Sequence, residues 1–393
     1  MDKLTLKGLD LKNKTVLMRA DFNVPQDANL AITDDTRIRA TLPTIKYIMQ
    51  NGAKKLVLMS HLGRPDGKVV AKYSLKPVAE RLKELLGEPV KFLDDCVGDA
   101  IKQEITQAKE RIILLENLRF HAEEEANDAK FAKDLASLGD LFINDAFGTA
   151  HRAHASTEGV THYLKSAAGF LLEKEIEYLG NAVENPEKPF MVILGGAKVS
   201  DKIGVIDNLL PKCEAIIIGG GMAYTFLKAQ GKQIGNSKLE KEKLDLAKSI
   251  LEKAAALKKE ILLPVDNVVV ESIDIGAKTE IFGENIPDGK IAVDIGPKTI
   301  ELFKAKLKQA KTIVWNGPLG IFEMDAFSNG TKEIAKFITT IDAVTIIGGG
   351  DTAAAVAKFK LDDKMTHIST GGGASLEYLE GKKLPGVAAL TDK

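Results

Sequence analysis

The stretch Ile346-Ile347-Gly348-Gly349-Gly350-Asp351-Thr352 passes from an apolar run, through three glycines, into a sequence that favours a helix. An apolar run of this length is typical of a buried strand, and glycine lets the backbone after it turn tightly and approach a ligand. Similar transitions occur at residues 216–221 and 368–375. The carboxyl ends of parallel strands share one edge of a sheet, where ligands bind. Three such turns therefore predict a parallel sheet that binds a polyanion.

The same alternation of short apolar runs and longer helical patterns extends over the whole chain. The runs lie at residues 16–18, 56–59, 112–115, 141–143, 191–194, 216–218, 261–263, 312–315 and 344–347. Strands that alternate with helices predict parallel sheets with crossover helices, which is the α/β class. The chain has 393 residues, and at about 150 residues per domain this favours two lobes. Residues 169–185 predict a helix that links them; a crossover helix within one large sheet is the alternative.

Composition excludes several classes of protein. With 54 basic and 55 acidic residues the net charge is −1, so no global field draws the chain to nucleic acid or to a membrane surface. Cys96 and Cys213 lack ligand spacing, which predicts buried thiols rather than a disulfide framework or a zinc site. The first 16 residues have no apolar core, and no run approaches ~18 apolar residues. We therefore expect a soluble, cytoplasmic protein.

The second half carries the groups expected of a phosphate site. Backbone N–H groups in glycine turns, followed by helix N-termini, bind phosphate. Asp351 and Thr352 follow one turn, where an aspartate either caps the helix or holds Mg²⁺ beside a nucleotide. Lys198 and Lys202 follow Gly195-Gly196 and are four residues apart, so a helix beginning here would place both on one face.

Two known nucleotide-binding patterns differ in how well they match these turns. The Walker A pattern G-x-x-x-x-G-K-[ST] is absent from the sequence. Residues 348–353 satisfy the loose dinucleotide pattern G-x-G-x-x-[GA], although no acidic residue closes a second strand about 20 residues later. A nicotinamide-dependent dehydrogenase therefore remains an alternative at this point.

The first half places basic side chains after successive strands. They occur in Arg19-Ala20-Asp21-Phe22-Asn23, His61-Leu62-Gly63-Arg64, Arg119-Phe120-His121 and His151-Arg152-Ala153-His154. Arginine and histidine gathered at one sheet edge suit a small molecule that bears phosphate or carboxylate. A cationic pocket in one lobe and a phosphate pocket in the other favour phosphoryl transfer by charge neutralisation, with closure of the lobes to exclude water.

Longer motifs in both halves make a family resemblance specific. They are residues 19–25 (RADFNVP), 60–65 (SHLGRP), 115–120 (LENLRF), 144–154 (NDAFGTAHRAH), the Lys198 segment, 315–318 (WNGP) and the turns at Gly348 and Gly371. Over essentially its whole length the chain resembles phosphoglycerate kinase of the bacterial type.

The resemblance implies the reaction, the architecture and the partners. The acyl phosphate of 1,3-bisphosphoglycerate moves reversibly to ADP with Mg²⁺, giving 3-phosphoglycerate and ATP. The implied fold is a monomer of two Rossmann-like, doubly wound domains that bend about a central helix. The substrate domain covers residues 1–170, the helix 171–185, the Mg-nucleotide domain 186–375, and a segment that returns to the first domain 376–393.

The resemblance also implies roles for individual residues. The 3-phosphoglycerate skeleton would be held by Asp21, Asn23, Arg37, His61, Leu62, Gly63, Arg64, Arg119 and Arg152. The nucleotide would be held by Lys202, Glu323, Gly349, Gly350, Asp351 and Thr352, with Asp351 on Mg²⁺. The moving phosphoryl group would be met by Lys198, Arg37 and the backbone N–H groups of Gly371 and Gly372.

One stretch departs from the commoner family pattern. Residues 289–297 have Lys-Ile-Ala, at Lys290 to Ala292, where many relatives place a tryptophan and a glycine. This stretch is on the nucleotide side, so it is left out of the predicted site. A phosphometabolite-binding protein without activity is a further alternative, and the presence of Lys198 and Asp351 argues against it.

Overall fold

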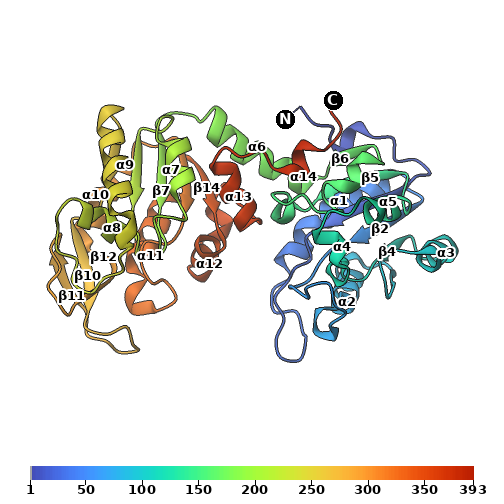
Figure 1. Cartoon of the computed structure of the whole chain (residues 1–393), viewed down its shortest axis with the longest axis horizontal. Helices are drawn as coiled ribbons and strands as arrows, with labels where there is room; N and C mark the ends of the chain where they lie inside the picture. The colour runs from blue at the N-terminus through green and yellow to red at the C-terminus, as the bar shows by residue number, and fades with distance from the viewer. Residues whose placement is uncertain (1) are drawn as a thin grey trace. The chain divides into compact units, whose positions relative to one another are not determined.

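The chain folds into two compact units, seen in the computed structural model, which describes residues 2–393 (Figure 1). Unit 1 comprises residues up to Glu177 together with Lys383–Lys393, and unit 2 comprises Tyr178–Lys382. Each unit contains its own six-stranded sheet, so the alternative of one large sheet is wrong. The α/β class with two doubly wound parallel sheets is confirmed.

Unit 1 is built on a sheet in the order β3-β4-β2-β1-β5-β6, with every pair parallel. Its strands are β1 (Thr15–Ala20), β2 (Lys55–Met59), β3 (Val90–Phe92), β4 (Ile112–Leu114), β5 (Leu141–Asp145) and β6 (Ser166–Ala168). Its helices are α1 (Thr36–Gln50), α2 (Lys76–Leu86), α3 (Asp99–Gln107), α4 (Ala122–Glu125), α5 (Ala129–Ala136) and α14 (Pro385–Ala388). All five residues of β2 and of β5 are buried, as expected where helices cover both faces of a sheet.

Unit 2 repeats this plan with the order β15-β14-β13-β7-β8-β9, again entirely parallel. Its strands are β7 (Phe190–Leu194), β8 (Ala215–Ile218), β9 (Glu260–Leu262), β13 (Thr312–Asn316), β14 (Val344–Gly348) and β15 (His367–Ile368). Its helices are α7 (Ile203–Leu209), α8 (Ala223–Ala229), α9 (Leu244–Ala256), α10 (Pro297–Leu307), α11 (Asn329–Ile338), α12 (Gly350–Lys358) and α13 (Gly372–Leu379). Trp315, fully buried, packs in the core between this sheet and its helices.

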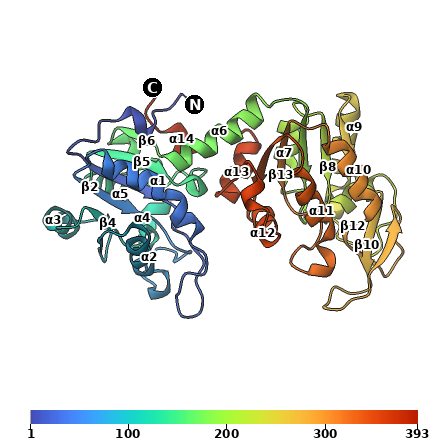
Figure 2. The same cartoon turned by 180° about the vertical axis from the view of Figure 1, so that it is seen from behind.

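A second, antiparallel sheet in unit 2 was not predicted from the sequence. It consists of β10 (Asp266–Val270), β11 (Glu280–Gly283) and β12 (Ile291–Ile295), in the order β11-β10-β12. It packs against α10 and α11, as Figure 2 shows from behind. This sheet carries part of the cleft described below.

The helix predicted at residues 169–185 is observed as α6 (Phe170–Glu184), and the division between the units falls within it. The C-terminal segment that packs with unit 1 begins at Lys383, whereas the sequence placed its start at 376. Asn144 donates from Nδ2 to the Gly386 carbonyl at 2.8 Å, and Lys3 pairs with Asp392, so both ends of the chain lie side by side (Figures 1 and 2). Within residues 2–393 no helix is long and apolar enough to cross a bilayer.

Candidate active site

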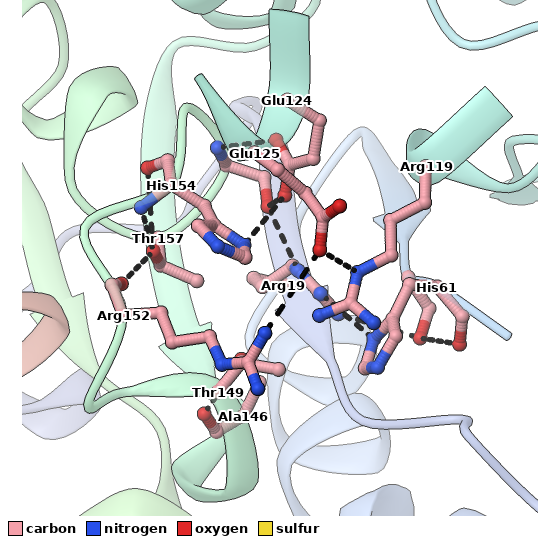
Figure 3. Close-up of polar contacts among 12 residues, drawn as sticks. Arg19, His61, Arg119, Glu124, Glu125, Ala146, Thr149, Arg152, His154 and Thr157 are labelled. Atoms are coloured by element: carbon pink, nitrogen blue, oxygen red, sulfur yellow. Dashed lines mark hydrogen bonds and ion pairs between the residues drawn. The ribbon is translucent and has the colours of Figure 1, made fainter. Parts of the chain in front are cut away.

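The predicted substrate residues of unit 1 come from loops at the carboxyl edge of its sheet. Asp21 and Asn23 follow β1, and His61 to Arg64 follow β2. Arg119 lies in the short helix Leu118–Phe120 after β4, and Arg152 follows the short helix Phe147–Thr149 after β5 (Figure 3). The strand order reverses between β1 and β5, which is where a doubly wound sheet opens a crevice.

Arg37 reaches this edge from the first turn of α1. Its Nη1 donates to both carboxylate oxygens of Asp21, at 3.2 and 3.1 Å, and to the carbonyl of Asn23 at 3.2 Å. Its Nε and Nη2 donors make no hydrogen bond with the described part of the chain. The guanidinium is therefore fixed in place and keeps free donors for a ligand.

The loop after β2 is shaped by glycine. Gly63 has φ +64°, and a Cβ there would lie 2.3 Å from the ring of Tyr73, so only glycine fits. Its N–H donates to Asn23 Oδ1 at 2.9 Å and its carbonyl accepts from Arg119 Nη1 at 3.1 Å. Leu62 differs from its predicted neighbours because its side chain is buried in the core of unit 1. Arg64 is exposed and has no hydrogen bond or ion pair among residues 2–393.

A buried polar layer lies beneath this surface. His61 Nδ1 is 3.0 Å from Arg19 Nη2, and Arg19 Nε donates to Ser156 Oγ at 2.9 Å. Burial, reinforced by the charges of Arg19 and Arg119, holds the pKa of His61 well below its usual value. A neutral ring that accepts at Nδ1 carries its proton on Nε2, so His61 can donate to a ligand anion.

Not every basic residue singled out in the first half belongs to the site. Arg19 is fully buried and acts within the layer below. His121 is elsewhere: its Nε2 lies 2.7 Å from Asp95 Oδ1, and it forms a group of potential metal ligands with Asp95 and Cys96, within 4.8 Å of one another. His162 pairs with Glu158 at 2.7 Å. Of the histidines in the motifs that follow strands, His61 lies with the predicted substrate residues, whereas His121 pairs with Asp95 in the loop after the outer strand β3. Cys96 and Cys213 are both buried and free, as predicted.

Glycine turns converge in unit 2 as the sequence predicted. A Cβ on Gly195 would lie 2.1 Å from the Pro318 carbonyl, and one on Gly220 would lie 2.7 Å from the Gly196 nitrogen. The turns before α12 and α13 also meet, since a Cβ on Gly372 would lie 3.2 Å from the Gly350 nitrogen. The predicted strand-to-helix geometry is thus present, with α12 and α13 both starting at these turns.

The two lysines are not on one helix face, and that expectation is wrong. α7 begins only at Ile203, so Lys198 and Lys202 lie in the turns before it. Lys202 Nζ donates to Asn316 Oδ1, and burial lowers the pKa of this lysine. Lys198 is exposed and makes no hydrogen bond or ion pair with any described residue.

Some polar groups near the N-terminus of α12 already have hydrogen-bond partners among the described residues, and others do not. Thr352 is buried, and its Oγ1 accepts from the Gly317 N–H at 2.7 Å, which leaves its hydroxyl proton and its backbone N–H to donate. The N–H of Gly371 donates to Ser369 Oγ at 3.3 Å. Asp351 lies in the first turn of α12, exposed, and its carboxylate makes no hydrogen bond or ion pair within residues 2–393; it is therefore not a helix cap.

A cleft of about 360 Å³ connects these turns with the antiparallel sheet. Its apolar lining includes Tyr224, Ile273, Ile291, Val293 and Leu319, and its polar lining includes Lys238, Glu323 and Asp351. Ile291, Ala292 and Val293 belong to the stretch that the sequence analysis set aside. A flat heterocycle fits the apolar part, while the glycine turns offer donors to phosphates.

Asn316, at the end of β13, was quoted in a motif but not assigned to the site. It is buried, its Oδ1 accepts from Lys202, and its Nδ2 has no hydrogen-bond partner in the described part of the chain, residues 2–393. An unpaired buried donor is costly and calls for an acceptor. Its signal in the sequence was its place at a strand end beside Gly317.

Comparisons with known proteins agree with this geometry. A family model described as "Phosphoglycerate kinase" matches residues 6–382. The curated phosphoglycerate kinases of Koribacter versatilis and Thermosipho africanus are 60% and 56% identical, over 100% of this chain and 100% and 99% of theirs. The solved structures of phosphoglycerate kinase from Coxiella burnetii and Pyrococcus horikoshii match with TM-scores of 0.90 and 0.85, at 44% and 34% identity, each covering 98% of both chains. The chain belongs to the phosphoglycerate kinase family, the phosphotransferases that act on a carboxyl group.

Proposed function

We propose that unit 1 holds 3-phosphoglycerate or 1,3-bisphosphoglycerate and that unit 2 holds ADP or ATP together with Mg²⁺. The reaction moves the acyl phosphate of 1,3-bisphosphoglycerate to ADP, reversibly. Membership of the family removes the nicotinamide enzyme suggested by residues 348–353.

The donors at the edge of unit 1 support the substrate assignment. Arg37, Arg119 and Arg152 supply guanidinium groups, which pair well with phosphate and carboxylate oxygens. His61, neutral and buried, adds an N–H donor, while Asn23 and Gly63 fix the loop between them. Arg64 adds an exposed cation at the same loop. These groups match the charge and the size of a three-carbon phosphorylated acid.

The cleft of unit 2 supports the nucleotide assignment. Its apolar wall fits a base, and Glu323, which lines it, is an acceptor for ribose hydroxyl groups. Lys202 and the N–H groups that open α12, at Gly350 to Thr352, lie where phosphates would follow. We assign Gly349 the role of letting the backbone turn there, since its φ is +86°.

The residues present also fit Mg²⁺. Asp351 offers a carboxylate that is exposed, unpaired among the described residues and part of the cleft lining. A single carboxylate completed by phosphate oxygens and water is a usual way for a protein to hold this ion. When bound, Mg²⁺ would neutralise phosphate charge; Asp351 would orient it.

Transfer requires charge neutralisation rather than a general base. The bond between the acyl oxygen and phosphorus breaks, a bond from the terminal ADP oxygen to phosphorus forms, and the carboxylate leaves with its electron pair. In the family pattern Lys198, Arg37 and the N–H groups of Gly371 and Gly372 stabilise the moving phosphoryl group. The Gly372 N–H, in the first turn of α13, is available for this, and Gly371 must release Ser369 Oγ to take part.

The observation that carries these roles is the unpaired ammonium group of Lys198 next to the glycine turns of unit 2. Removing one preorganised charge costs roughly 10²- to 10³-fold in kcat. We expect Lys198→Ala to lose kcat by this factor while KM changes little, as measured by steady-state kinetics. Lys228→Ala, which removes an exposed lysine of α8, is the control. If KM rose and kcat held, Lys198 would bind the ground state and have no special role in transfer.

We further propose that the enzyme acts as a monomer in the cytoplasm, without nucleic-acid or membrane partners. The near-zero net charge supports the absence of polyanionic partners. Light scattering on an eluting sample gives the oligomeric state directly: a mass near 42.5 kDa is expected, and a multiple of it would overturn the proposal.

A further inference from the structure

Two arginines of the substrate site share one acidic neighbour. Glu125, at the end of α4, has its Oε1 3.2 Å from Arg119 Nε and 3.9 Å from Arg152 Nη1. Figure 3 shows the Glu125 carboxylate between the two guanidinium groups. Arg119 is 5% exposed, so its charge has little access to water and needs an anion nearby.

Glu124, the acidic residue just before Glu125 in the helix, has a different role. Glu124 is fully buried and accepts from the N–H of Ser156 at 2.9 Å and from its hydroxyl. The Glu125 side chain is 41% exposed and has no partner other than the two arginines within residues 2–393. Glu125 is therefore the movable anion at the mouth of the site, while Glu124 is a fixed part of the layer below.

A carboxylate and a phosphate offer guanidinium groups the same kind of acceptor oxygen. Glu125 pairs with both arginines by charge, since Arg119 Nε has no hydrogen-bond partner within residues 2–393 and Arg152 Nη1 lies 3.9 Å from the carboxylate. The proposed function assigns the same two guanidinium groups to the substrate. Placing a second anion beside the Glu125 carboxylate is unfavourable, so the two anions compete for this pair of arginines.

We propose that Glu125 is a built-in counter-anion, which holds Arg119 and Arg152 in place while the site is empty and is displaced when an anionic substrate binds. The inference rests on the proposed substrate site. It makes Glu125 a positioning residue rather than a catalytic one, because the carboxylate has left the arginines when the substrate is bound.

Because each anionic ligand must displace the Glu125 carboxylate before it binds, the apparent affinity of the site for every such ligand is lowered. It also favours ligands with more charge, since a phosphate dianion competes with a carboxylate better than a singly charged ion does. Specificity of this type comes from a repulsive group, here the Glu125 carboxylate, that disfavours the wrong ligand. The affinity given up is small, because partly exposed ion pairs are weak.

The test compares Glu125→Gln with Glu123→Gln. Both remove one charge from the same helix, and Glu123 is exposed and pairs with neither arginine. Two measurements are made on each full-length protein: the apparent Kd for inorganic sulfate from thermal protection, and KM and kcat for 3-phosphoglycerate. We expect E125Q to lower the sulfate Kd and the KM about threefold with kcat nearly unchanged, and E123Q to change none of them. The difference should shrink at high salt.

Other results would overturn the proposal. A higher Kd and KM in E125Q would mean that the carboxylate orients the arginines for the ligand instead of competing with it. Equal shifts in both variants would mean a general charge effect. If E125Q does not fold, Glu125→Asp keeps the charge but retracts it, and an unchanged sulfate Kd would then count against the proposal. Failure of the proposed function is seen separately, as an unchanged KM in Arg152→Ala.

Discussion

The imidazole of His154 lies among the arginines of the substrate site in unit 1 and adds no positive charge of its own at neutral pH. It is buried, 4.0 Å from Glu124 through its Nδ1, and surrounded by Arg19, Arg119 and Arg152. Burial, then these charges, lowers its pKa to about 3. Burial and nearby positive charges also lower the pKa of His61. At neutral pH the arginines carry the charge of the site and the two histidines stay neutral.

This neutral histidine makes stability depend on pH in a defined direction. Between pH 6.5, its ordinary pKa, and pH 3 the unfolded chain binds a proton at His154 that the folded chain does not. The free energy of unfolding therefore falls on acidification, with a limiting slope of about 1.4 kcal/mol per pH unit from this residue. We expect His154→Asn to flatten the profile between pH 6 and 4 by about 1 kcal/mol per unit.

Urea unfolding of both proteins at several pH values measures this difference. The comparison with the variant is needed because Asp145, whose pKa burial raises to about 6, contributes the opposite slope in both proteins. Its folded form binds the extra proton between pH 6 and 3.8, so its contribution is lost as pH rises. Parallel profiles for wild type and variant would show that His154 titrates normally in the fold.

At the same scale, the residue pattern alone placed basic side chains after strands and gave no sign of those whose position depends on packing. Arg37 was assigned only through the family resemblance, because nothing in residues 34–39 shows that Asp21 lies beside it. Glu125 is one of three successive glutamates, and only the fold distinguishes the buried one, the paired one and the free one. Such roles are properties of neighbours that are distant in sequence.

Among the elements, the turns of unit 2 contain glycines that are needed for two different reasons. At Gly195 a side chain has no room, because its Cβ would lie 2.1 and 2.5 Å from two carbonyl oxygens. At Gly350, in the first turn of α12, a Cβ would meet nothing within 4 Å among residues 2–393 apart from its chain neighbours and the backbone of its own helix. Packing requires the first glycine, and the proposed nucleotide requires the second.

Alanine substitutions test this distinction. We expect Gly195→Ala to destabilise unit 2 by several kcal/mol, since backbone must move. Gly350→Ala should leave the melting temperature unchanged or slightly higher, because alanine favours helix, and should raise KM for the nucleotide. Thermal melts and kinetics of both variants decide the matter. A stable, fully active Gly350→Ala protein would remove this turn from the nucleotide site.

The strands were predictable and the loops less so, for a physical reason. Strands covered on both faces need continuous apolar runs, which stand out in the sequence. β10 and β12 are mostly buried, but Asp266, Asn267 and Asp294 shorten their apolar runs, and β11 has only partly buried and exposed residues. The helix expected at Lys198 begins only at Ile203, and the N–H and hydroxyl of Ser200 in the preceding turn donate to Glu240, distant in sequence, at 3.1 and 2.6 Å.

For the molecule as a whole, the proposal divides one reaction between two units that each have their own sheet and core. Phosphoryl transfer requires the two ligands in line and water excluded, so we expect the units to close when both ligands bind. Small-angle scattering should show a smaller radius of gyration with 3-phosphoglycerate and Mg-ATP together than with neither. The same radius in both conditions would contradict closure.

We expect this chain to transfer a phosphoryl group between 3-phosphoglycerate and ATP with Mg²⁺. Turnover is measured by coupling through glyceraldehyde-3-phosphate dehydrogenase to NADH oxidation, with each of the three components omitted in turn. Activity is expected only when all three are present. Turnover without Mg²⁺, or a folded protein inactive with all three, would contradict it.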